Sequence, residues 1–307
     1  MSPVVALVLS VFLAGTTVAG DLGGYLEDSA ASEFAGEQLV ACDTPDGDRR
    51  SVFQIAQSEG IVTAWASDEA GVPIVTVGPG TSTIVEGETV EATLVEGSVM
   101  ADDEIYSVGE ETETTFLGRG ALDVSLIRDD SERVLLTVDS ETGAVVRTRV
   151  FDGAGDLYCD RRLLSFETGP VELPVEAEVA GELESVEPIT APDLLPEDVE
   201  GFQLLDTYQL DDGTLSYYSD GFFSAGVVIT GRPVSLAVDD SVTFRSNGGE
   251  YRREYQAGAV TVTWATEQGN MALVGDLPPD LLEAVLDGLP APARQGFFGR
   301  IWESLFG

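Results

Sequence analysis

Short apolar runs separated by turn-forming residues leave this chain few folds to adopt. Between residues 34 and 100 the runs are FAGEQLVAC, SVFQIAQ, IVTAWA, VPIVTVG, STIV and TVEATLVEG, with DTPDGD, SEG, SDEAG, PGT and EGE between them. Runs of this length, punctuated by Gly, Asp and Pro, predict short strands that are joined by tight turns. The first part of the chain is therefore predicted to form an antiparallel meander.

The strand pattern returns after an acidic interruption. Residues 101–115, ADDEIYSVGEETETT, are weakly patterned and predict a mobile loop. Residues 116–170 hold further apolar runs separated by RDDSE, SETG and DGAGD, which is hairpin chemistry. Residues 171–200 contain ten acidic residues, four prolines and no arginine. Such a composition predicts an extended linker.

A second set of strands follows the linker, in residues 201–290. The runs FQLLDTYQL, TLSYYSD, FFSAGVVITG, SVTFRS, EYRREYQAG, AVTVTWATE and ALVGD each predict one strand. Residues 277–289, LPPDLLEAVLDGL, predict a helix, because prolines occupy its first turn and Gly288 stands at its end. The whole chain is thus expected to be α+β and mostly β, with domains at residues 21–170 and 201–290.

Composition excludes several classes of function. The chain carries 55 acidic residues against 15 Arg, with neither Lys nor His, so its formal net charge is −40. No basic surface for duplex nucleic acid can be built at that charge. Catalytic triads and metal sites that need His, and phosphate loops that need Lys, are excluded as well. Carboxylate chemistry, metal sites with oxygen ligands, and binding remain as possible functions. The acidity itself is typical of proteins that stay soluble in concentrated salt.

The N-terminus and the two cysteines bear on the compartment. Residues 4–14, VVALVLSVFLA, have the length of a signal-peptide core, although no cation precedes them. Residues 1–20 are therefore either a signal peptide or an uncleaved anchor. Export would bring the chain into an oxidising compartment, where Cys42 and Cys159 would form a disulfide; the alternative is two buried thiols.

Acidic side chains crowd two of the predicted turns. Asp43, Asp46 and Asp48 share the turn DTPDGD, and Asp152 and Asp156 share DGAGD. Oxygen-rich turns can hold calcium, but the spacing of an EF-hand is missing, so solvated hairpin turns are the favoured interpretation. We expect no metal, no cofactor and no catalytic residues.

Two stretches resemble the MucB/RseB family of extracytoplasmic sigma-factor regulatory proteins. Residues 116–167 are similar to its block of glycine-arginine, strand, turn and hairpin, carried here by Gly118-Arg119, Asp139-Ser140-Glu141-Thr142-Gly143 and Asp152-Gly153-Ala154-Gly155. Residues 202–290 resemble the family's C-terminal domain, with Tyr218-Ser219-Asp220-Gly221 as the clearest match and with the Trp264 strand followed by ALVGDLPPDLLEAVLDGLP at its end.

The resemblance implies a fold and a function. The N-terminal domain would be a LolA-like antiparallel half-barrel, closed by helices around an apolar cavity, and a smaller α/β domain would follow. Members of the family lie outside the cytoplasmic membrane, bind the extracytoplasmic segment of a membrane-spanning anti-sigma factor and slow its proteolysis. They are thought to sense misplaced lipid or lipoprotein. Residues Tyr218, Ser219, Asp220 and Gly221 would help to hold the anti-sigma partner.

A lipid cavity would be lined by the apolar faces of the meander. The alternative for each residue is an ordinary place in the core. The candidates for contact with acyl chains are Phe53, Ile55, Val62, Trp65, Val75, Val77, Leu94 and Phe116.

The last segment, residues 291–307, differs from the rest of the chain. Its large apolar residues recur at helical spacing, and its side chains carry a net charge of +1. The segment is either a helix docked on its own sheet or a helix that contacts a partner or a membrane surface. The apolar residues are Phe297, Phe298, Ile301, Trp302, Leu305 and Phe306.

Three functions follow from these observations. We expect an exported, non-enzymatic regulator, possessing two domains whose arrangement responds to a ligand. The second candidate is a lipid or lipoprotein carrier of the cell envelope without a sigma-factor role. The third is a carboxylate hydrolase of the envelope, to which no constellation of residues points.

Overall fold

The fold is taken from a computed structural model. It describes Tyr25, Ser29 and residues 31–58, 61–66, 73–78, 81–86, 89–94, 105–171, 189–210, 212–231, 241–246, 248–256 and 258–293. The proposed signal peptide at residues 1–20 and the apolar tail residues from Phe297 to Phe306 lie outside these ranges. None of the helices in the described ranges is long and apolar enough to cross a membrane.

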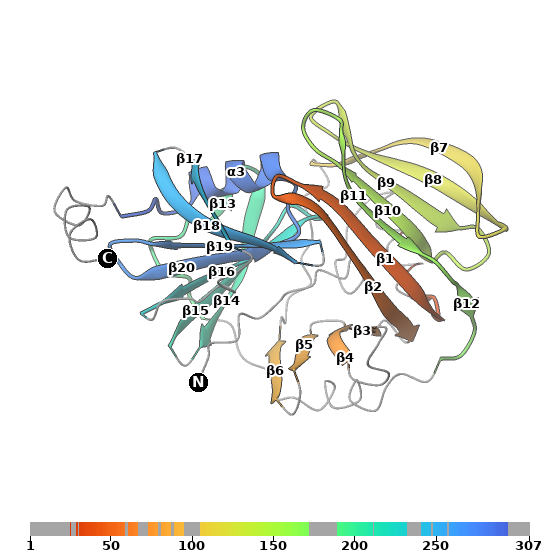
Figure 1. The fold of residues 1–307 in the computed structure, drawn as a ribbon, viewed down its shortest axis with the longest axis horizontal. Coiled ribbons are helices and arrows are strands. Elements are labelled where there is room, and N and C mark those ends of the chain that lie inside the picture. Colours follow the sequence, from red (N-terminus) through yellow and green to blue (C-terminus); the bar gives the residue numbers. More distant parts are fainter. Residues whose placement is uncertain are drawn as a thin grey trace.

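The first half of the chain forms one antiparallel sheet, called here the N-terminal sheet (Figure 1). Its order is β6-β5-β4-β3-β2-β1-β11-β10-β9-β8-β7, with β12 paired to β1. The first and last long strands of this half, β1 and β11, are neighbours, so a long-range pairing holds the meander together. The strands are β1 Phe34–Thr44, β2 Gly47–Ser58, β3 Ile61–Ala66, β4 Pro73–Gly78, β5 Thr81–Glu86, β6 Thr89–Leu94, β7 Ser107–Phe116, β8 Arg119–Arg128, β9 Ser131–Asp139, β10 Val145–Phe151, β11 Leu157–Leu163 and β12 Glu167–Thr168.

The second half forms another antiparallel sheet, the C-terminal sheet. Its order is β13-β14-β15-β16-β20-β19-β18-β17. The predicted helix is present as α3, Pro279–Gly288, and it buries Leu281, Leu282, Val285 and Leu286. The strands are β13 Asp198–Val199, β14 Phe202–Leu210, β15 Gly213–Ser219, β16 Ser224–Thr230, β17 Val242–Ser246, β18 Gly249–Gln256, β19 Ala259–Ala265 and β20 Asn270–Gly275.

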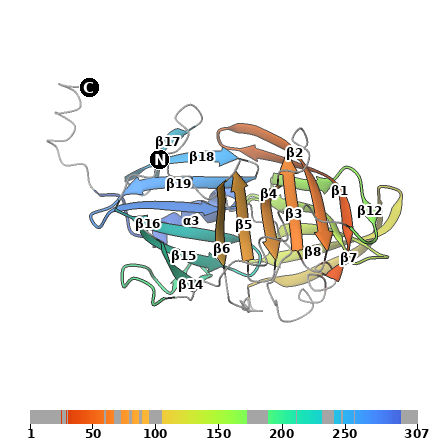
Figure 2. The same cartoon turned by 90° about the horizontal axis from the view of Figure 1, so that it is seen from below.

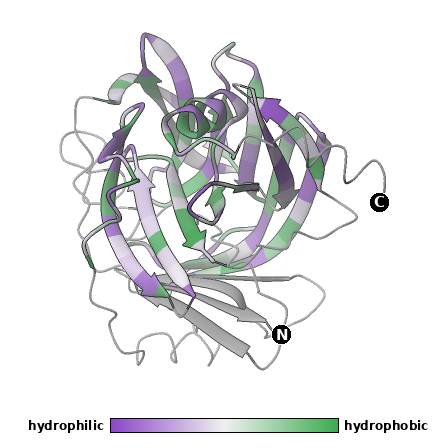
Figure 3. Ribbon diagram, turned by 90° about the vertical axis from the view of Figure 1, so that its left-hand side faces the viewer, coloured by the Kyte–Doolittle hydropathy of each residue, from purple (hydrophilic) through white to green (hydrophobic). Residues whose placement is uncertain are grey.

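The two faces of the N-terminal sheet differ in chemistry, because side chains alternate along each strand. The apolar face carries Val40, Phe53, Val124, Leu136 and Val150, all of them buried. On the polar face, ion pairs join the strands: Arg147 of β10 lies 2.7 Å from Asp160 of the adjacent β11, and Arg149 of β10 lies 3.1 Å from Asp123 of β8, across β9. Figure 3 shows the same alternation of hydrophobic and hydrophilic residues along the strands. The alternation fixes which face turns toward the core.

The core is shared between the two sheets. One cluster of buried side chains joins the apolar face of the N-terminal sheet to residues of the C-terminal sheet and of α3. Figure 2 shows the two sheets from below, with β3 to β6 continuing the N-terminal sheet in front. Because apolar residues of both sheets are removed from water together, separating the sheets would expose core.

Two expectations from the sequence need correction. Residues 107–116 are the edge strand β7, not a mobile loop, and β8 supplies its hydrogen bonds. The predicted linker ends earlier than residue 200, because Leu195 and Val199 are buried in the common core. Of the closing helices that the resemblance implies, Tyr25, Ser29 and Ala31 are described and helical, and the other residues of 21–30 lie outside the described ranges. The mostly β, α+β class is confirmed, as are the hairpin of residues 34–58 and the seven strands predicted after the linker.

Candidate functional site

Arginine–aspartate pairs join the two halves of the molecule. Three arginines of the N-terminal sheet reach aspartates on the loops and helix of the second half, and one arginine of the C-terminal sheet reaches back. Four such pairs lie within the described residues. They are Arg128–Asp220 at 2.5 Å, Arg133–Asp280 at 2.7 Å, Arg161–Asp276 at 3.6 Å and Arg253–Asp46 at 2.7 Å.

Asp220 accepts more hydrogen bonds than the other aspartates of these four pairs. It follows β15 in a tight turn and is 1% exposed. Its Oδ2 accepts hydrogen bonds from Arg128 Nη1 at 2.5 Å and Tyr106 Oη at 2.8 Å. Its Oδ1 accepts the backbone N–H groups of Phe222 at 2.9 Å and Phe223 at 2.7 Å. Burial raises the pKa of Asp220, while Arg128, the two N–H groups and Tyr106 oppose the rise.

Arg128 connects this carboxylate to the end of the linker. Its Nη2 donates to the backbone oxygen of Glu200 at 2.7 Å, next to the start of β14. Its guanidinium lies 5.7 Å from the ring centroid of Phe202 and 6.0 Å from that of Tyr106. A planar guanidinium suits such stacking as well as ion pairing. One side chain of β8 therefore holds both the 219–223 turn and the chain that enters the C-terminal sheet.

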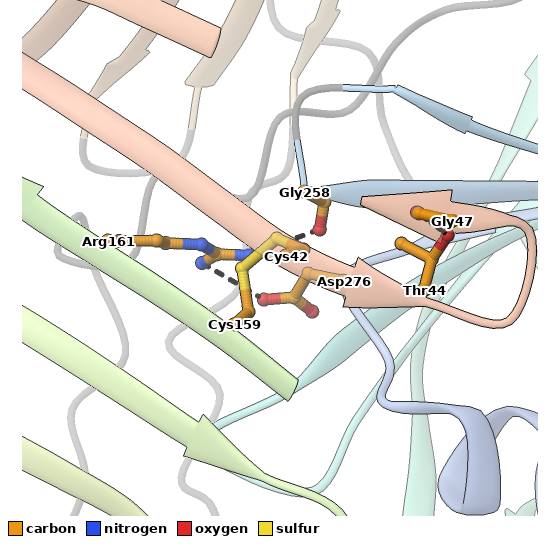
Figure 4. The surroundings of a disulfide bond; sticks show 7 residues. All are labelled: Cys42, Thr44, Gly47, Cys159, Arg161, Gly258 and Asp276. Carbon is orange, nitrogen blue, oxygen red and sulfur yellow. Dashed lines mark hydrogen bonds and ion pairs between the residues drawn. A yellow bond between two sulfur atoms is a disulfide. The ribbon is translucent and has the colours of Figure 1, made fainter. Parts of the chain in front are cut away.

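The disulfide lies beside a second contact between the sheets (Figure 4). Cys42 of β1 and Cys159 of β11 are directly opposite in register and are bonded, which confirms the predicted disulfide. In Figure 4, Arg161 extends past the disulfide toward Asp276 and Gly258. Its Nη2 donates to the backbone oxygen of Gly258 at 3.3 Å. The disulfide thus fixes the strand pair from which Arg161 reaches the C-terminal sheet.

Asp276 is buried with fewer partners than Asp220. It follows β20 directly and is 2% exposed. Its Oδ1 accepts the backbone N–H of Ser224 at 3.2 Å, whereas its Oδ2 has no hydrogen bond and lies 3.6 Å from Arg161. Burial raises the pKa of Asp276 to about 6, and Arg161 only partly opposes this.

The turn DTPDGD takes part in the interface through Asp46. Arg253 of β18 donates Nε and Nη2 to the two carboxylate oxygens of Asp46, at 2.8 and 2.7 Å. The same guanidinium lies 4.7 Å from the ring centroid of Phe244. Asp46 is therefore bound to an arginine, and no group of three or more potential metal-ligating side chains occurs in the described part of the chain.

The residues predicted to hold a partner are buried in this structure. Tyr218, Ser219 and Asp220 are between 1% and 5% exposed, and Gly221 is buried with them. The hydroxyl of Tyr218 donates to the backbone oxygen of Pro196 at 2.8 Å. These four residues position the 219–223 turn against the N-terminal sheet, so any partner would have to reach them through the interface.

The predicted cavity residues divide between the two faces of the N-terminal sheet. Phe53, Ile55 and Val62 are buried on the apolar face. Trp65 is half-buried and pairs with Gln54, which places it on the opposite face and corrects its assignment to the cavity. The backbones of Val75, Val77 and Leu94 lie in β4 and β6, and Phe116 packs against a small buried cluster that includes Ile55 and Val62.

A groove of about 920 Å³ lies elsewhere, along β14. Its walls are residues 189–193, 195, 197 and 198 on one side and residues 203–207 on the other. The chain itself bridges it, because the N–H of Ile189 donates to the oxygen of Thr207 at 2.7 Å. Asp193, Glu197, Asp198 and Asp206 give the groove an acidic lining.

The fold and interface define a class: two antiparallel sheets and one C-terminal helix, held together by a shared core and buried Arg–Asp pairs. No protein-family model matches the chain, and no curated protein matches its sequence. Solved structures of MucB are among those that it resembles. Similarity to the complex structure of Pseudomonas aeruginosa MucA/MucB has a TM-score of 0.54 at 19% identity, covering 89% of this chain and 99% of that one.

Two further structures agree. MucB in complex with MucA(peri) gives a TM-score of 0.53 at 19% identity, covering 89% of this chain and 99% of that chain. MucB alone gives 0.53 at 20% identity, covering 86% of this chain and 94% of that chain. The resemblance to the MucB/RseB family that the sequence indicated is thus confirmed for the fold, across both sheets.

Proposed function

We infer that this protein is an exported, non-enzymatic regulator of an extracytoplasmic-function sigma factor pathway. It binds the extracytoplasmic segment of a membrane-spanning anti-sigma factor. The observation that carries this proposal is the MucB fold over 89% of the chain, together with two MucB structures that are complexes with MucA. Fold alone does not specify function, so the order of the sequence blocks, including Tyr218 to Gly221, is the second support.

The disulfide supports the exported location. Bonded cysteine pairs persist in oxidising compartments and are rare in the cytosol. Cys42 and Cys159 form such a pair across two central strands. With the apolar run of residues 4–14, this favours a location on the outer side of the cytoplasmic membrane.

Regulation would act through the contact between the two sheets. Arg128 and Asp220 join the N-terminal sheet to the turn that carries the proposed partner residues. A lipid or lipoprotein acyl chain that bound the apolar face of the N-terminal sheet, near Phe53, would compete with the packing of the two sheets. A ligand with different affinities for the closed and parted arrangements changes their populations, and with them the affinity for the partner.

Capture from the cell envelope tests the proposal. The tagged full chain is used as bait in detergent-solubilised envelope, and proteins and lipids in the eluate are identified together by mass spectrometry. A single-span protein with a cytoplasmic sigma-binding domain supports the regulator. If lipid or lipoprotein is recovered without such a protein, the carrier function replaces the regulator function. If neither a single-span protein nor lipid is recovered, both functions are contradicted.

A further inference from the structure

Asp276 lies where the two sheets meet, and its carboxylate is poorly compensated. The titratable and charged groups that act on it are Arg161 and Tyr158 of β11, Tyr217 of β15 and Asp220 of the 219–223 turn. Of these four groups, only Arg161 is a cation, and it lies 3.6 Å from the carboxylate of Asp276. The same guanidinium also donates a hydrogen bond to the backbone oxygen of Gly258. The charge of Asp220 is of the same sign as that of Asp276 and adds to the cost of ionising it.

The contrast with Asp220 shows how incomplete this compensation is. Asp220 accepts four hydrogen bonds, two of them from backbone N–H groups of its own turn. Asp276 leaves Oδ2 without any hydrogen bond although the residue is 2% exposed. A buried carboxylate with an unsatisfied oxygen is costly when it is ionised and cheaper when it holds a proton.

Parting of the sheets would relieve this cost. The burial of Asp276 depends on contacts with both halves, since Arg161 belongs to the N-terminal sheet and Ser224 to the C-terminal sheet. Once the sheets part, water reaches the carboxylate and it ionises with little penalty. The closed arrangement therefore prefers protonated Asp276, and the parted arrangement prefers the ionised form.

We propose that Asp276 makes the contact between the two sheets sensitive to pH, so that the contact tightens when the carboxyl takes up a proton. The pKa of Asp276 is raised by burial to about 6 in the closed arrangement and returns toward 3.8 when exposed. The closed form thus binds more protons between these values. Its stabilisation is present in acid and is lost as pH rises through about 6.

Linkage gives the size of the effect. For these two pKa values, the equilibrium constant for closed over parted sheets is about ten-fold larger at pH 5 than at pH 7.5. The pH dependence belongs to the contact between the sheets and does not rest on the identity of the proposed partner. The sheets should therefore part most easily above neutral pH.

Hydrogen exchange of the interface amides tests the proposal. Protection factors are measured by mass spectrometry for residues 222–225 and 272–276 of the full chain between pH 5 and 7.5, after correction for intrinsic exchange. In the wild type, protection should rise about ten-fold from pH 7.5 to pH 5. Asp276→Asn, neutral at every pH, should hold high protection throughout.

Two further variants keep the test decisive. Asp156→Asn removes one exposed surface charge and should follow the wild type, which separates the interface from relief of general repulsion in an acidic protein. Arg161→Gln removes the cation that opposes the rise in the pKa of Asp276, so the pH at which interface protection is half lost should move upward. This variant decides the question if Asp276→Asn fails to fold. An unchanged pH dependence in Asp276→Asn, or an unmoved midpoint in Arg161→Gln, overturns the proposal.

Discussion

Arg128 and Asp220 are 92 positions apart in the sequence, yet their side chains form a buried ion pair between the two sheets. Neither side chain is more than 9% exposed. Removing one partner of such a pair leaves an uncompensated buried charge. The pair is therefore the point at which a single substitution should most weaken the contact between the sheets.

Arg128→Ala should lower the free energy of unfolding by about 3–5 kcal/mol, because Asp220 then remains buried without its cation. Urea denaturation measures this loss. Arg245→Ala is the matched control, since the ion pair of Arg245 with Glu250 is largely exposed. That control should cost about 1 kcal/mol or less. Equal losses of unfolding free energy in the two variants would contradict the stabilising role of the buried ion pair between the sheets.

Gly258→Ala should destabilise the protein through a clash between the sheets. An added Cβ would lie 2.9 Å from Cγ1 of Val40 and 3.5 Å from Sγ of Cys42. Gly155 has the same φ of 84°, and nothing lies within 4 Å of its added Cβ. Gly155→Ala thus measures the backbone strain alone, about 1–2 kcal/mol. A thermal midpoint no lower for Gly258→Ala than for Gly155→Ala would show that the contact is absent.

Loss of the disulfide should destabilise both sheets together. The bond closes a separation of 117 residues and lies beside Arg161 at the interface. Cys42→Ala combined with Cys159→Ala should cost about 2–5 kcal/mol of unfolding free energy. Reductant should shift the unfolding midpoint of the wild type toward that of the double variant and leave the variant unaffected. A wild-type midpoint insensitive to complete reduction would refute the expectation.

Helix α3 should contribute to stability through its buried leucines. Leu282 is 1% exposed, and Leu282→Ala should cost about 2–5 kcal/mol. Leu157 of β11 is 45% exposed, and Leu157→Ala should change stability by about 0.5 kcal/mol or less. Chemical denaturation of the two variants tests whether the helix packs on the common core. Similar small effects at both positions would mean that it does not.

Local sequence patterns were sufficient to predict the strands and the helix in which apolar residues recur at a regular spacing. The hairpin of β1 and β2, the strands after the linker and α3 were all predictable, because apolar spacing and turn residues agree there. Strand β7 was missed. Its residues are acidic and largely exposed, and it is a strand because β8 pairs with it at the sheet edge. Propensity is a weak guide where tertiary pairing decides.

The interface could not be predicted from the sequence. Three of its four described ion pairs join residues 92, 147 and 207 positions apart, and no local spacing marks such partners. One signal was available: with only 15 cations in the chain, a buried arginine needs a specific carboxylate. Tyr218 to Gly221 were singled out by resemblance alone, and the structure places them at the end of β15 and in the buried turn that follows, beside Arg128.

The measurement that tests the central claim most directly is binding of the purified full chain to the extracytoplasmic segment of the single-span protein captured from the envelope. Isothermal titration calorimetry should show saturable association, and an acyl-chain lipid added beforehand should change the affinity. Association that lipid does not alter would leave a partner-binding protein without the sensing role. Absence of association with any captured envelope segment would contradict the assignment as a regulator.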